Sequence, residues 1–176
     1  MSRSSMRIKY ITVSAMLCAL GVILMSVGSL IEVLDLSTAV LASMLCVYAV
    51  IEIGKGYPWM IWLATSCLSL ILLPIKTPAI FYALFAGFYP ILKEKLEKLS
   101  RPISWLLKLV VFHLCLGLIF LILKLFLPSA LEGTDVWWML AAIYGMALVC
   151  FVVYDIALTR LITFYLFRLR KHFRIK

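Results

Sequence analysis

The sequence predicts an all-α integral membrane protein, a compact bundle of six transmembrane helices with both termini in the cytoplasm. Composition is the first reason: 65% of the 176 residues are apolar and 14% are charged, whereas soluble domains average about 45–50% apolar and about 25% charged residues. The second reason is that the apolar residues form long runs between short polar segments. The third is a charge asymmetry: of the 17 Lys and Arg residues, only Lys76 and Lys124 fall toward the predicted outer face, as the positive-inside rule describes.

The first two predicted helices cover residues 10–31 and 36–53. The first run follows a basic N-terminal segment, but it is longer than the core of a signal peptide, about 7 to 15 residues, and has no clear small-residue cleavage site. We therefore expect this helix to be retained. Glu32 and Asp35 then mark an outer loop, because two carboxylates without a cation fit the non-cytoplasmic side.

The third and fourth predicted helices, 57–73 and 78–92, form a hairpin. The link from Pro74 to Pro78 reads as a tight turn, because prolines cannot continue a helix through their missing N–H. At 1.5 Å per residue each helix reaches only about 22 to 26 Å, against about 30 Å of hydrocarbon. Two full spans and a re-entrant pair both remain open, and both place the turn outside and the following basic block inside. That block contains Lys93, Lys95, Lys98 and Arg101.

The last two predicted helices cover residues 103–127 and 137–159, with an acidic outer loop between them. The segment 160–176 interleaves cations with aromatic residues. We expect it to be a basic cytoplasmic tail that lies on anionic lipid headgroups. No internal repeat is visible, and residues 1–176 are expected to form a single membrane domain.

Two carboxylates, Glu52 and Asp155, fall inside predicted spans. An ionisable group in a span costs about 2.5 to 3.5 kcal/mol on insertion scales, so each of them needs a partner or water. Both lie near predicted inner helix ends, where Lys55, Arg160 or water can satisfy them. The second interpretation is that Asp155 and Arg160 belong to a contact with a cytoplasmic partner or a coupling element.

His113 is the only histidine in a predicted span. A metal site needs further His, Cys or carboxylate ligands at helical spacing, and His113 has none at i+3 or i+4. The sequence therefore favours a hydrogen-bonded interhelical histidine over a ligand for a substrate or a proton.

The predicted outer mouth of the bundle is ringed by charged residues, most of which would form only a solvated rim. Glu32, Lys76 and Lys124 are the candidate substrate-binding residues. Lys76 stands out, because the flanking prolines hold its turn stiff and preorganise a cation for an anionic group.

No catalytic signature is present: the chain lacks G-x-S-x-G, H-E-x-x-H and a phosphate-binding glycine loop. We therefore expect no enzymatic activity, no cofactor and no metal site. The net charge of +9 reflects cytoplasmic retention of cations, not nucleic-acid binding. Without an ATP-binding motif, a chain of this size is expected to need a partner for active transport.

Small residues mark the first predicted helix. Ala15 and Ala19 share one stripe, with Gly21 and Gly28 further along, and such stripes let helices approach closely, either within the bundle or against a partner. The chain resembles the substrate-binding S components of energy-coupling factor transporters. The resemblance lies in its size, its six predicted spans with both termini in the cytoplasm, its basic N-terminus and Ala15-x-x-x-Ala19.

This resemblance implies that Ala15 and Ala19 dock on a transmembrane coupling subunit, which acts with two ATPase subunits in the plasma membrane of a bacterium. It also implies a small-molecule substrate, a vitamin or related micronutrient, captured at the outer side. The alternative is a membrane scaffold or accessory subunit that has no transport function.

Overall fold

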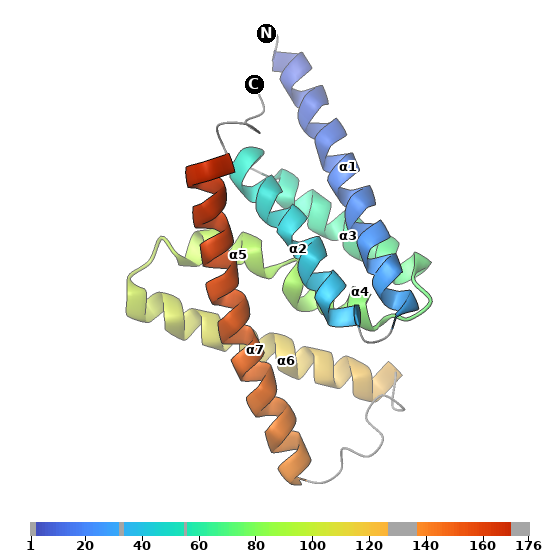
Figure 1. The fold of residues 1–176 in the computed structure, drawn as a ribbon, viewed down its shortest axis with the longest axis vertical. Coiled ribbons are helices and arrows are strands. Elements are labelled where there is room, and N and C mark those ends of the chain that lie inside the picture. The colour runs from blue at the N-terminus through green and yellow to red at the C-terminus, as the bar shows by residue number, and fades with distance from the viewer. Residues whose placement is uncertain (1–2, 32–33, 55, 127–136, 170–176) are drawn as a thin grey trace. The chain divides into compact units, whose positions relative to one another are not determined.

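The computed structural model describes residues 3–31, 34–54, 56–126 and 137–169. Within these ranges the chain is helical and contains no strand (Figure 1). The contacts separate into two compact units, Met1–Leu109 and Val110–Lys176. The all-α class predicted from the sequence is therefore confirmed.

The first unit is built from helices whose ends follow the apolar runs closely. α1 packs along both α2 and α3 (Figure 1). α1 begins earlier than the predicted residue 10, since the Arg, Met and Lys residues before it are good helix formers. The helices are α1 (Arg3–Leu30), α2 (Asp35–Glu52), α3 (Tyr57–Leu72), α4 (Thr77–Phe81), α5 (Tyr89–Leu96) and the start of α6 (Arg101–Phe126).

The predicted single helix 78–92 is instead broken into three pieces. α4 leads into a π-helical segment, η2 (Tyr82–Ala86), and α5 restarts after a turn. The Gly87 N–H donates to the Tyr82 carbonyl at 2.8 Å, which is the i→i+5 bond of a π-helix. Pro90 then lies in the first turn of α5, where a missing N–H is tolerated.

The second unit consists of the rest of α6, α7 (Trp137–Phe164) and a π-helical segment, η4 (Tyr165–Leu169). Phe112 of α6 stacks on Phe151 of α7 with ring centroids 4.6 Å apart. α7 continues beyond the predicted end at residue 159, so part of the predicted tail is helical. The predicted outer loop between the last two helices and residues 170–176 lie outside the described residues.

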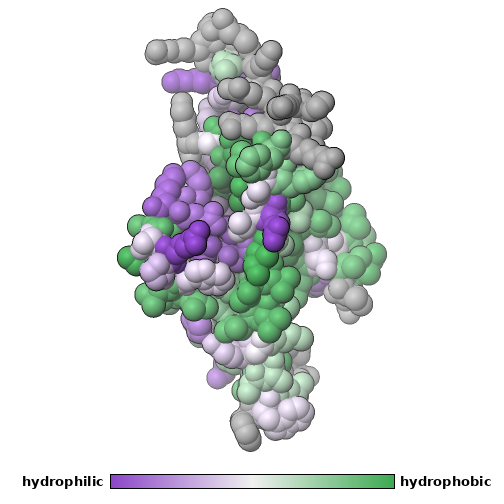
Figure 2. Space-filling view, turned by 60° about the vertical axis from the view of Figure 1, so that its left-hand side comes forward, coloured by the Kyte–Doolittle hydropathy of each residue, from purple (hydrophilic) through white to green (hydrophobic). Residues whose placement is uncertain are grey.

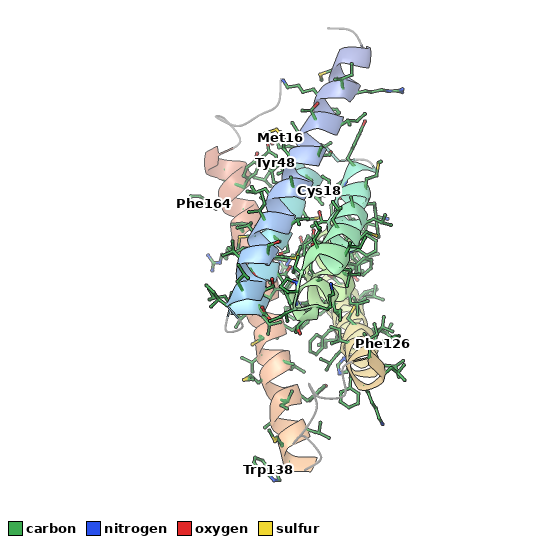
Figure 3. All side chains as sticks on the ribbon, turned by 90° about the vertical axis from the view of Figure 1, so that its right-hand side faces the viewer. Met16, Cys18, Tyr48, Phe126, Trp138 and Phe164 are labelled. Carbon is green, nitrogen blue, oxygen red and sulfur yellow. The ribbon has the colours of Figure 1, made fainter. Side chains whose placement is uncertain are left out.

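Four stretches in the described part of the chain are long and apolar enough to cross a membrane. This supports the membrane class that the composition predicts. α3 is also apolar but has only 16 residues. The four stretches are Met6–Leu30, Asp35–Glu52, Arg101–Phe126 and Trp138–Phe167; Figure 3 labels Phe126 and Trp138 at the ends of α6 and α7.

Small side chains allow close packing inside the first unit. Gly28 of α1 lies directly against Thr38 of α2, and a Cβ built on Gly28 would overlap the Thr38 side chain. The buried core contains Met25, Ala39, Ala42, Leu73, Ala79, Tyr82 and Ala86, with Trp62 and Phe81 packed against it.

Gly28→Ala is expected to push α1 away from α2 and to destabilise the protein by about 1–3 kcal/mol, the usual cost of overpacking a filled interior. Gly117→Ala is the matched control, because a Cβ built there has no described atom within 4 Å apart from its chain neighbours and the adjacent backbone of its own helix. The control should be neutral or stabilising by up to about 1 kcal/mol, since alanine favours helix over glycine. Thermal unfolding in detergent measures both. Equal transitions for Gly28→Ala and the wild type would contradict the close approach.

Candidate functional site

The small residues of α1 divide into two sets on opposite faces. Gly21 and Gly28 are buried, and the nearest side chains to them are Thr65 and Thr38. Ala15 and Ala19 are exposed. They lie on a broad apolar face of α1 that the other described residues of the first unit leave exposed. The large exposed side chains of this face are Ile8, Ile11, Met16, Leu20, Ile23 and Val27, whereas Cys18 is on the buried side (Figure 3 labels Met16 and Cys18).

Lys76 is half-buried just after α3. Its Nζ donates to the carbonyl of Leu73 at 2.6 Å and to that of Ile71 at 3.4 Å. These carbonyls belong to the C-terminal end of α3, where a cation is favoured by the helix dipole. The structure therefore gives Lys76 a capping contact. Lys124 is exposed in the last turn of α6, and Glu32 lies outside the described residues.

Lys76→Ala is expected to lower the stability of the ligand-free protein by about 0.3–1 kcal/mol, because the end of α3 loses its cation. If Lys76 also holds an anionic group of the substrate, the same change should weaken ligand binding by about 1–3 kcal/mol. Lys76→Arg keeps the charge and serves as the control. A loss of stability with unchanged ligand affinity would leave Lys76 with the capping role alone.

His113 contacts the neighbouring helix. Its Nε2 lies 2.6 Å from the hydroxyl oxygen of Tyr144, which joins α6 to α7 within the second unit. Both side chains are exposed. Such a bond satisfies two polar groups in an apolar span and holds the two helices in register.

The remaining sequence-predicted residues differ in burial. Asp155 is only 3% exposed on α7, whereas Arg160, five residues later, is exposed. Glu52 is half-buried and is the last residue of α2. Among the residues that the structure describes, no three His, Cys, Asp or Glu side chains gather as metal ligands would.

The structure also reveals a polar cluster that the sequence did not predict. Lys93 of α5 is fully buried and Lys108 of α6 is 4% exposed. The ammonium of each lies 3.4 Å from the same carboxylate oxygen, Oε1 of Glu97. Two buried cations sharing one carboxylate tie the end of α5 to the start of α6.

Helical spacing was the available signal for this cluster. Lys93 follows the buried Tyr89 by four residues and precedes the buried Leu96 by three. Lys108 similarly lies four residues after Ser104 and four before Phe112, and both of these are buried. Each lysine thus continues the inward stripe of its helix.

The described helices define an all-helical protein with several helices able to cross a membrane. No protein-family model matches the chain, and no curated protein or solved structure shows significant similarity to it.

Proposed function

We propose that the chain is the substrate-binding membrane subunit of a small-molecule uptake transporter, powered by partner ATPase subunits through a transmembrane coupling subunit. The observation that carries the proposal is the exposure of Ala15 and Ala19 on α1. Small side chains on an outward face of a membrane helix allow a second helix to approach closely.

The proposed substrate is a vitamin or related micronutrient taken up across the plasma membrane of a bacterium. The transport class is supported by the resemblance in size, hydrophobic runs and alanine spacing. The outer turn with Lys76 is the proposed place of an anionic substrate group, and Glu32 and Lys124 are proposed to line the same mouth.

A second candidate function is a membrane scaffold or accessory subunit. The filled core of the first unit favours it, because Met25, Leu73 and Tyr82 are each at most 1% exposed. In this alternative the α1 face and the basic tail serve only protein and lipid contacts.

Affinity purification of the tagged chain from its native membrane, followed by mass spectrometry, separates the two functions. Recovery of ATPase and coupling subunits together with a retained small molecule is the result expected for a transporter. Recovery of a membrane complex without ATPases would instead favour the scaffold.

The proposed topology has six spans with both termini inside, and it predicts which sites an impermeant thiol reagent can reach. Lys76→Cys and Gly133→Cys, in a background without native cysteines, should be labelled from outside intact cells, because both positions lie in proposed outer loops. Lys98→Cys should be labelled only after the membrane is opened. Labelling at position 98 in intact cells would overturn the topology.

A further inference from the structure

The turn between α5 and α6 carries a charged surface that the proposed transport function does not use. Figure 2 shows hydrophilic side chains gathered on this side of the molecule, with hydrophobic surface beside them. We call this surface the α5–α6 corner. Its exposed polar residues are Glu94, Lys95, Glu97, Lys98, Ser100 and Arg101.

Both carboxylates of the corner are already engaged by lysines. Glu94 Oε1 lies 3.0 Å from Lys98 Nζ, and Glu97 is shared by the two buried lysines. Within the described ranges, neither Lys95 nor Arg101 forms an ion pair. These two exposed cations therefore present their charge to the surroundings.

Tryptophan side chains accompany the lysines. The Lys95 ammonium lies over the ring of Trp59, 5.6 Å from its centroid, and the Lys108 ammonium lies at the same distance from the centroid of Trp105. Tryptophan is enriched where a membrane protein meets the lipid headgroups. The corner therefore has the composition of a membrane interface.

An exposed apolar face begins at the corner and runs along α6. Its members within the first unit are Ile103 and Leu106, which are three residues apart on one side of the helix. They have 51% and 65% of their surfaces exposed.

From this juxtaposition we propose that the α5–α6 corner binds the headgroup phosphate of an anionic phospholipid. Lys95 and Arg101 supply the cations, and the exposed face of α6 receives an acyl chain. A free phosphate would contact only the cations. A phospholipid has a charged headgroup joined to apolar acyl chains. The cations with an apolar face directly beside them therefore match a lipid better than a free phosphate.

The test is native mass spectrometry of the full-length protein in detergent, titrated with phosphatidylglycerol and with phosphatidylcholine. Lys95→Gln combined with Arg101→Gln should weaken phosphatidylglycerol binding about 25-fold, at about fivefold for each cation, and leave phosphatidylcholine binding unchanged. Arg7→Gln changes an exposed cation on α1 and is the matched control for the single variants Lys95→Gln and Arg101→Gln. It removes the same charge as either of them and should retain the wild-type preference for phosphatidylglycerol.

Three results would overturn the proposal. Equal losses in the corner and control variants would mean that only the overall charge attracts the lipid. Displacement of phosphatidylglycerol by glycerol phosphate at comparable concentrations would identify a site for a small anion. Binding of a partner protein that depends on Lys95 and Arg101 and displaces phosphatidylglycerol would identify the corner as a protein interface. Thermal transitions equal to the wild type establish that the variants are folded.

Discussion

Replacing Ala15 and Ala19 together with tryptophan is expected to leave the chain folded and able to bind its ligand, yet unable to co-purify with coupling and ATPase subunits or to support uptake. Both side chains are exposed on α1, on the face opposite the buried Gly21 and Gly28, so the added bulk is directed away from the packed side of the helix. A partner helix that relies on small side chains would be held away along the whole stripe. Co-purification, uptake and the thermal transition in detergent are the three measurements.

A matched control exists on α7, where Ala141 and Gly145 are exposed at the same four-residue spacing. The double tryptophan variant at these positions adds equal bulk to another apolar helix and should keep its partners. Loss of partners in both variants would show that bulk in the membrane, and not the α1 stripe, prevents assembly. Aggregation of the α1 variant alone would show that the stripe is internal packing and would remove the main support for a transporter.

Glu97→Gln is expected to destabilise the protein by about 2 kcal/mol. The substitution removes the carboxylate that the buried ammoniums of Lys93 and Lys108 share at 3.4 Å. Breaking a buried ion pair on one side commonly costs about 3–5 kcal/mol, and the 41% exposure of the Glu97 side chain lowers that figure through solvent screening. Thermal or denaturant unfolding in detergent measures the change.

Glu94→Gln is the control for this prediction, since it makes the same chemical change three residues away. Glu94 pairs with Lys98 at 3.0 Å, but both side chains are at least half exposed. Such a pair contributes at most about 1 kcal/mol, and less at high salt. If the two variants are equally stable, Glu97 does not hold the α5–α6 connection together.

The sequence was sufficient to locate most of the helices, because a helix usually ends where an apolar run gives way to a solvated polar segment. α2 and α3 each end one residue before the predicted position. The break at η2 could not be predicted in this way, because apolar residues continue through Tyr82–Ala86 and hydropathy does not distinguish an α-helix from a π-helix. Directly after this break the rings of Tyr82 and Trp62 lie close to Gly87, where a Cβ would come within 2.6 and 2.7 Å of them.

The candidate site was predicted less completely. A dense group of lysines normally indicates a solvated segment, and Lys93 belongs to the basic block predicted on the cytoplasmic side, although its spacing from Tyr89 places it on the inward stripe. Side-chain burial depends on which helix faces are covered, and this information is not local to the sequence. For the same reason the exposure of Ala15 and the burial of Gly28 required the packing of α1 against α2.

The contact between Trp62 and Gly87 has an evolutionary consequence. The indole N–H of Trp62 donates to the Ala83 carbonyl at 2.9 Å, and a Cβ on Gly87 would lie 2.7 Å from the indole ring. The same Cβ would lie 2.6 Å from the Tyr82 ring, so the three positions share one volume. In descendants of this chain we expect them to change together: a side chain at position 87 should accompany smaller residues at positions 62 and 82, and lineages that keep the two rings should keep the glycine.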